Sequence, residues 1–166
     1  IIGEIANLLL LKRELDLIGD KLHLVTVEDG EELDIIGHRV RFFDVRSIKT
    51  KQFGFTMYYG DGKKLTCCGD EPFHDCEKEY VYGSEWLLHE AFCLYSQADI
   101  FQPYEKNHST VADACKLAAE LKIKNLILYH TEDKNLQNRK TLYYNEGREY
   151  FSGNLYIPND LEVFEV

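Results

Sequence analysis

The segments HSTVADA (residues 108–114) and LILYHTE (residues 126–132) determine how this chain folds. In the first, a histidine stands directly before a capping-box pattern formed by Thr110 and Asp113, and apolar residues then recur at helical spacing. In the second, a nearly continuous apolar run at residues 125–129 is typical of a strand buried on both faces. Ligand sites in open α/β sheets lie at the carboxyl ends of strands, so we expect both histidines at one sheet edge.

Composition indicates one folded domain spanning residues 1–166, since 45% of the residues are apolar. The formal net charge of −10 argues against a broad nucleic-acid interface, which needs a basic stripe. No apolar run is long enough for a membrane span, and residues 1–11 lack the pattern of a signal peptide. We therefore expect no membrane contact and a cytoplasmic location.

Five cysteines are present, an odd number, and two of them are adjacent: Cys67, Cys68, Cys76, Cys93 and Cys115. This usage favours buried, reduced thiols. Zinc-thiolate binding is not favoured, because no C-x-x-C pair occurs.

The remaining pattern predicts a mixed α/β chain with hairpins. A helix is expected at residues 1–12 and a hairpin turn at Gly60-Asp61-Gly62. Residues 33–36 fit a short helix or a strand, and residues 75–82 fit a helix or a loop. Strands are expected at six further places, namely residues 22–27, 40–45, 52–59, 64–68, 85–88 and 161–166.

Three strand-like runs end in polar clusters, at Asp70, at His89-Glu90 and at His130, and His108 starts the intervening helix. A carboxylate and several imidazoles at neighbouring strand ends are typical of a metal site. Taken singly, Asp70 also fits a plain turn, and His89 fits a packed or hydrogen-bonded residue. Glu90 is expected to order its loop or to orient a ligand from behind.

The other histidines, at positions 23, 38 and 74, fit surface or structural roles.

Four segments together resemble the successive C-terminal motifs of the metallo-β-lactamase superfamily, in its ribonuclease Z-like branch: residues 65–72, 87–92, 108–110 and 126–131. The resemblance covers about residues 52–132 and implies an αββα sandwich. It implies that Asp70 bridges two zinc ions and that His130 ligates one of them. It also implies that His108 contacts the scissile phosphate and assists proton transfer, while His89 and Glu90 match the family's His-Glu-Ala-aromatic segment.

The chain also departs from the family pattern. The leading metal motif, H-x-H-x-D-H, is absent, and residues 1–9 resemble the helix that follows it, so the N-terminal part of the fold is expected to be missing. The family's further histidine upstream of Phe53 is absent too. The short run from Phe55 to Asp70 leaves no room for the long arm with which ribonuclease Z grips tRNA.

The sequence therefore predicts a metal-dependent hydrolase, a di-zinc phosphodiesterase of ribonuclease Z-like type without the tRNA-gripping arm. Its expected substrate is a small-molecule or nucleotide phosphodiester, and extended tRNA binding is not expected. The expected cofactor is zinc, with two ions in the intact site. A tyrosine-rich stretch near the C-terminus suits a homodimer contact. The alternative is a catalytically silent fragment or subunit that keeps the fold for assembly or partner binding. A β-lactam or thioester hydrolase is a third possibility, which the His-Ser-Thr motif disfavours.

Overall fold

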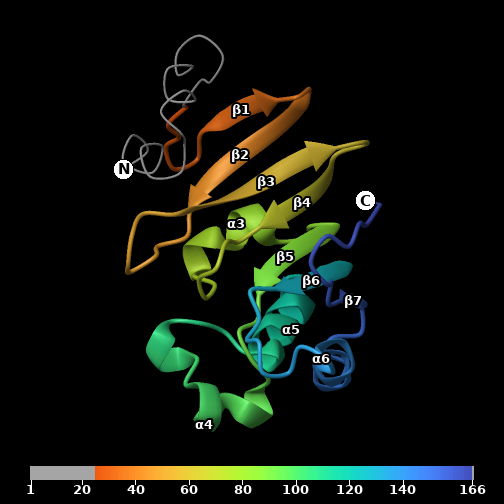
Figure 1. The fold of residues 1–166 in the computed structure, drawn as a ribbon. Coiled ribbons are helices and arrows are strands. Elements are labelled where there is room, and N and C mark those ends of the chain that lie inside the picture. The colour runs from red at the N-terminus through yellow and green to blue at the C-terminus, as the bar shows by residue number, and fades with distance from the viewer. Residues whose placement is uncertain (1–24, 166) are drawn as a thin grey trace, which may run out of the picture.

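A computed structural model describes residues 25–165 of the chain. Seven strands form a single sheet in which the spatial order of the strands is their order in the sequence (Figure 1). The strands are β1 (Glu32–Ile35), β2 (His38–Asp44), β3 (Phe53–Tyr59), β4 (Lys63–Cys67), β5 (Trp86–Glu90), β6 (Asn125–Tyr129) and β7 (Asn154–Tyr156).

The sheet changes character half-way across. Strands β1 to β4 are antiparallel neighbours joined by loops, whereas β4 to β7 are parallel neighbours. The β3–β4 hairpin turns at Gly60-Asp61-Gly62, as predicted, and both glycines there have positive φ. Parallel neighbours need crossover connections, and each crossover in this part of the chain carries a helix.

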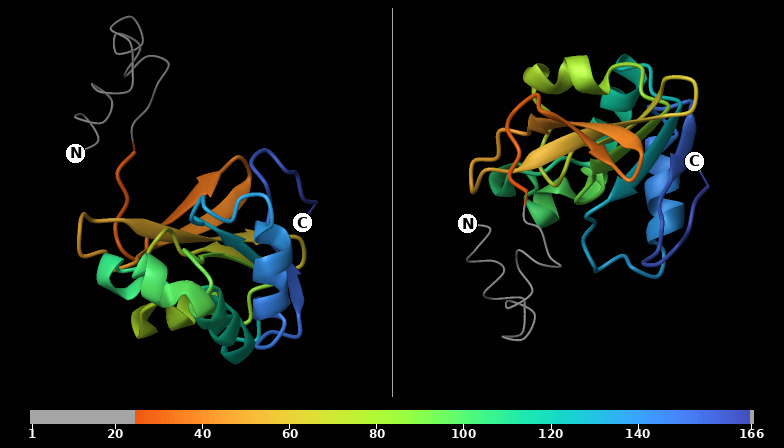
Figure 2. Two further views of the ribbon diagram at one scale, coloured as in Figure 1. Left: turned by 60° about the horizontal axis from the view of Figure 1, so that its bottom comes forward. Right: turned by 90° about the horizontal axis from the view of Figure 1, so that it is seen from above.

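Helices cover one face of the sheet (Figure 2). The crossover helices are α3 (Lys78–Val81), α5 (Val111–Glu120) and α6 (Arg139–Gly147), and the shorter elements are η1 (Asp75–Glu77), η2 (Tyr95–Gln97), α4 (Ala98–Phe101) and η3 (Tyr104–Lys106). Leu87, Leu126 and Leu128 point from the parallel strands into the core beneath these helices. Phe43 continues the same face on β2, where its ring stacks on Tyr80 of α3 at 4.8 Å.

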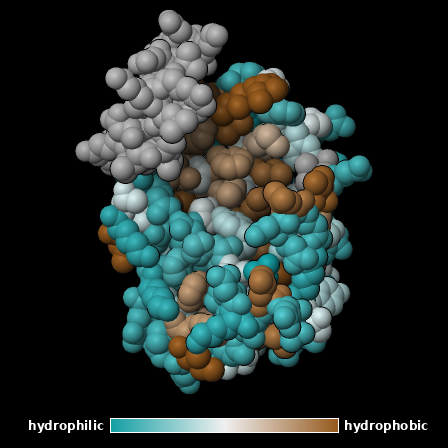
Figure 3. Space-filling view, in the orientation of Figure 1, coloured by the Kyte–Doolittle hydropathy of each residue, from teal (hydrophilic) through white to brown (hydrophobic). Residues whose placement is uncertain are grey.

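The opposite face of the sheet is apolar but only partly covered by the described residues. Side chains alternate between faces along a strand, so the neighbours of the core-facing residues point the other way. These include Phe42, Phe55, Met57, Leu65 and Leu88, all half-buried. Figure 3 shows the resulting apolar patch over the upper strands. We call this surface the open face.

The helix predicted after His108 and the strand predicted at residues 125–129 are both confirmed. Strand β6 begins and ends where its apolar run does. Helix α5 starts directly after Thr110, whose Oγ1 accepts a hydrogen bond from the Asp113 backbone N–H at 3.3 Å. Asp113 in turn accepts the Thr110 backbone N–H at 3.0 Å, which completes the capping box.

Other expectations differ from the structure. Strand β5 runs on through His89 and Glu90, because both pair with β6. Residues 25–27 of the strand expected at 22–27 form no strand, and neither do residues 161–165, where Leu161 is almost fully exposed at a positive φ. These segments have alternating apolar residues but pair with no strand among the described residues. Helix α6 was not predicted, because its apolar residues lack a clear helical stripe.

The helix expected at residues 1–12 lies outside the described residues. Residues 33–36 resolve as strand β1, and residues 75–82 resolve largely as η1 and α3. Within residues 25–165, no helix combines the length and the apolar character that crossing a membrane requires.

Candidate active site

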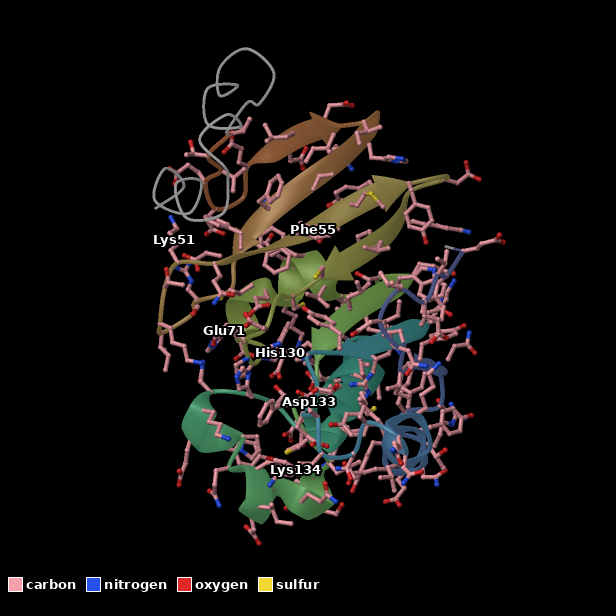
Figure 4. The ribbon with its side chains drawn as sticks, viewed as in Figure 1. Lys51, Phe55, Glu71, His130, Asp133 and Lys134 are labelled. Carbon is pink, nitrogen blue, oxygen red and sulfur yellow. The ribbon has the colours of Figure 1, made fainter. Side chains whose placement is uncertain are left out.

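The predicted site residues lie on strand ends and on loops at one edge of the sheet. Asp70 follows β4, Glu90 ends β5, His130 directly follows β6, and His108 precedes α5. Because β4, β5 and β6 are parallel, their carboxyl ends meet at this edge. Figure 4 labels Glu71, His130, Asp133 and Lys134.

His108 occupies the centre of this edge and is 92% buried. Its ring stacks on Phe92, with the ring centroids 5.1 Å apart. The ring of His130 lies 5.0 Å from it on another side. The fold therefore brings the two predicted functional histidines together, although 22 positions separate them in the chain.

Glu90 lies behind His108 and is fully buried. Its Oε1 accepts the backbone N–H of Ser109, and its Oε2 is 3.5 Å from Nδ1 of His108. That separation is too long for a well-formed hydrogen bond. Neither Oε2 nor Nδ1 has another partner among the described residues, so the two buried atoms can move together to share a proton.

Burial dominates the acid–base properties of this pair. It raises the pKa of Glu90 to about 7, and the nearby Asp70 and Glu71 carboxylates act in the same direction. Burial also lowers the pKa of His108, helped by His130 and Lys49, while Asp70 and Glu71 oppose the shift. Both shifts favour neutral forms, as expected where charges lose their hydration.

His89 points to the helix-covered side of the sheet. Its Nδ1–H donates to the carbonyl oxygen of Glu90 at 2.7 Å, and the side chain is 1% exposed. Burial lowers the pKa of His89. The side chain lines a pocket together with Asn107 and His108, and the structural role expected for it stays a prediction.

His130 and Asp70 are the more accessible members of the group. His130 is exposed and has φ of +52°, a left-handed conformation that is uncommon for a residue with a side chain. Such strain is often found at functional sites. Asp70 is half-buried and follows Gly69, whose φ of +73° bends the chain sharply after β4. The hydroxyl of Tyr129 donates to the Gly69 carbonyl oxygen and anchors that bend.

Among residues 25–165, no three His, Cys, Asp or Glu side chains gather in a way that could hold a metal ion. Asp70 and His130 therefore do not form a complete metal site with their described neighbours, because zinc sites use at least three protein ligands. The described edge supplies an imidazole with a carboxylate behind it and two potential metal donors.

Comparisons with known proteins identify the fold. Ribonuclease Z of Bacillus cereus is 32% identical over 105 residues, which are 63% of this chain and 33% of that protein. The metallo-β-lactamase fold protein YhfI of Bacillus subtilis superposes with a TM-score of 0.67 at 15% identity, over 81% of this chain and 52% of that one. Zn²⁺-bound PqqB of Methylobacterium extorquens superposes with a TM-score of 0.73 at 12% identity, over all of this chain and 62% of that one. No family model matches.

This chain has the metallo-β-lactamase fold. Its sequence is similar to that of ribonuclease Z, in agreement with the predicted resemblance to the ribonuclease Z-like branch. The chain spans about a third of the length of the curated relatives that it matches. The described residues form one sheet with one layer of helices, which corresponds to one βα half of the predicted αββα sandwich.

On this metallo-β-lactamase fold, two site features were missed from sequence. Phe92 supports the ring of His108, and its backbone also binds Ser109 and Glu132. Glu71 is 98% buried and accepts hydrogen bonds from Ser47 and Asn107. Ser47 belongs to the stretch before Phe53 where the family's further histidine was expected. In the sequence, Glu71 stands beside Asp70 in a predicted turn. An acidic residue in a turn does not by itself indicate that the side chain is buried.

Proposed function

We propose that this chain forms part of the active site of a metal-dependent hydrolase that cleaves phosphodiesters, of ribonuclease Z-like type. The observation that carries the proposal is the placement of His108 between Phe92, His130 and the buried carboxylate of Glu90. The similarity to ribonuclease Z supports a phosphodiester as the substrate class. The predicted lack of a tRNA-gripping arm, the homodimer and the cytoplasmic location remain proposals from the sequence.

In this proposal, His108 acts on the reacting phosphodiester through its outer ring nitrogen. Nδ1 faces Glu90, so Nε2 is the nitrogen that remains for a substrate oxygen. Nε2–H stabilises charge developing on a phosphoryl oxygen or protonates the leaving group. Glu90 holds the ring in position and compensates the charge of the imidazolium form, while Phe92 prevents the ring from tilting.

Asp70 and His130 are proposed as metal donors. Their oxygen and nitrogen atoms suit zinc, and one solved structure of this fold is a Zn²⁺-bound protein. The described residues lack a third donor in reach, so the remaining donors of a one- or two-zinc site would come from outside residues 25–165.

The test compares hydrolysis of bis-p-nitrophenyl phosphate by the whole protein that carries this chain and by two variants, His108→Ala and Asp70→Ala. We expect each variant to lose at least about a hundredfold in kcat, the scale of removing one group that stabilises the transition state. His38→Ala is the matched control, because His38 is an exposed histidine at the start of β2. Unchanged turnover in both variants would refute the proposal.

A catalytically silent subunit is the second candidate function. The open face and the lack of a three-donor cluster among the described residues favour it. Metal content separates the two candidates: elemental mass spectrometry of the dialysed whole protein that carries this chain is expected to find no bound zinc if the chain is a silent scaffold. Close to two zinc ions per chain would support the hydrolase.

A further inference from the structure

We propose that Glu71 is a positioning residue that fixes the loop carrying His108. Glu71 directly follows Asp70 and is 2% exposed, so its carboxylate lies inside the protein at the edge of the sheet. Glu71 is labelled in Figure 4. A buried carboxylate is unfavourable unless its oxygens are hydrogen-bonded, which directs attention to its partners.

The Glu71 carboxylate joins two loops that are far apart in the sequence. The Ser47 hydroxyl donates to Oε1 at 2.5 Å, and the Asn107 side-chain amide donates to Oε2. Ser47 is itself held by the Gln52 side-chain amide, which donates to its Oγ at 3.3 Å. The β2–β3 loop is thereby linked through one carboxylate to the residue immediately before His108.

Asn107 is the point at which this link acts on the backbone. Its φ is +60°, in the left-handed region, where a residue with a side chain needs support from its surroundings. The chain turns here, and the next backbone N–H, that of His108, donates to the Pro103 carbonyl oxygen at 2.9 Å. Holding the Asn107 side chain fixes the conformation from which the His108 side chain projects.

A second contact joins the same two loops. Nζ of Lys49 donates to the Lys106 carbonyl oxygen at 3.3 Å. Lys49 is exposed, so this contact is weaker than the buried one. The two contacts together make the β2–β3 loop a support for residues 104–108, with Glu71 as its buried centre.

The consequence concerns where the His108 ring lies. It is 3.5 Å from the Glu90 carboxylate and 5.0 Å, ring to ring, from His130, distances that the loop conformation sets. Misplacing a reacting group by about 1 Å can reduce turnover about a hundredfold. The catalytic meaning of this support rests on the proposed function, whereas the support of the loop does not.

The first experiment measures amide hydrogen exchange in the 166-residue chain. Glu71→Ala removes the link, and Asn107→Asp sets two carboxylates against each other. Each is expected to speed exchange of the His108 amide at least about tenfold, which corresponds to about 1.4 kcal/mol and is within the range of one hydrogen bond to a charged group. The double variant Glu71→Gln/Asn107→Asp restores an amide–carboxylate pair with the roles exchanged, so it is expected to restore slow exchange.

Glu146→Gln is the matched control. The Glu146 carboxylate also ties two segments together, by accepting the backbone N–H groups of Tyr95 and Ser96 at 2.8 and 3.2 Å, but it lies on α6 away from His108. We expect it to leave exchange at His108 unchanged. If Glu71→Ala does not fold, the comparison of Asn107→Asp with the double variant still decides the matter.

The second experiment measures bis-p-nitrophenyl phosphate hydrolysis by the whole protein with the same substitutions. We expect kcat to fall at least about tenfold in Asn107→Asp, with KM changed less than about twofold, and to recover in the double variant. Unchanged exchange in both single variants, or faster exchange with unchanged kcat, would overturn the inference. Faster exchange in a protein that has no turnover before substitution would instead overturn the proposed function and leave the support of the loop in place.

Discussion

The two faces of the sheet differ in what covers them, although the sequence makes both apolar. On the helix-covered face, Leu87, Leu126 and Leu128 are at most 1% exposed. On the open face, Phe55, Met57 and Leu65 are only half-buried among the described residues. Apolar content therefore does not distinguish the faces, and the connections between strands do.

The direction of the crossovers explains the asymmetry. Strands β4 to β7 are added one after another in the same direction across the sheet. Crossovers between parallel strands are almost always right-handed, so a constant direction puts every crossover helix on the same face. Covering both faces requires the order to reverse, as in doubly wound sheets. The described part of the chain has no such reversal, so its own helices can cover one face only.

A matched pair of truncations tests this comparison with the largest expected effect. Leu128→Ala, beneath the helices, should lower the free energy of unfolding by about 2–5 kcal/mol, because it leaves a cavity in a closed core. Leu65→Ala, on the open face, should cost roughly 1 kcal/mol, because its side chain is already partly exposed. Urea denaturation measures both. Equal losses would show that the open face is as well covered as the other.

The covered side also buries a titratable group, which gives the second prediction. Burial raises the pKa of Glu77 from 4.5 to about 8. Between pH 4.5 and about 8, the Glu77 carboxyl is ionised in the unfolded chain but still protonated in the folded protein. The free energy of unfolding should therefore fall as the pH rises toward 8. The largest slope is about 1.4 kcal/mol per pH unit.

Glu77→Gln keeps the size of the side chain and removes this titration. The variant should lose this component of the slope in urea denaturation at several pH values, whereas Glu105→Gln, at an exposed position, should keep it. An unaltered slope in Glu77→Gln would show that the carboxyl ionises as freely in the folded protein as in the unfolded chain.

The third prediction concerns the anchoring of α5 over the covered face. Thr110→Ala removes the side-chain cap of the helix and should destabilise the protein by about 1 kcal/mol. Thr110→Ser keeps the hydroxyl and should recover most of that loss. Thermal unfolding followed by circular dichroism compares the two, and equal stability of both variants would show that the capping box contributes nothing.

The smallest effect on stability is expected on the open face itself. Phe55→Ser should change the free energy of unfolding by less than about 1 kcal/mol, the range of a cross-strand pair such as Phe55 with Phe42. It should, however, reduce binding of the dye ANS, which reports exposed apolar surface (Phe55 is labelled in Figure 4). Unchanged dye binding would mean that other parts of the molecule cover Phe55 in solution.

Sequence reasoning worked best where local pattern and tertiary environment agree. The apolar run of β6 and the capping box of α5 each carry their own signal, and both elements have the predicted bounds to within a residue. The ordered motifs also located the sheet edge at which His108 and His130 meet, because parallel strands bring their ends together.

Sequence reasoning failed where tertiary contacts decide. Helix α6 has few apolar residues, but Tyr143 is fully buried and Gly147 packs so closely that an added Cβ would lie 2.5 Å from Leu155. The role of Glu71 depends on Ser47 and Asn107, which are 24 and 36 positions away in the chain. No local pattern reports such distant partners.

The strand order has a consequence for synthesis on the ribosome. Each strand from β2 to β7 pairs with the strand made just before it, so no later strand must insert between two that are already paired. The sheet can therefore grow at one edge as the chain emerges, at about 5–20 residues per second. During that growth the newest strand is always the exposed edge, and the crossover helix that precedes each of β5, β6 and β7 is available before its strand is.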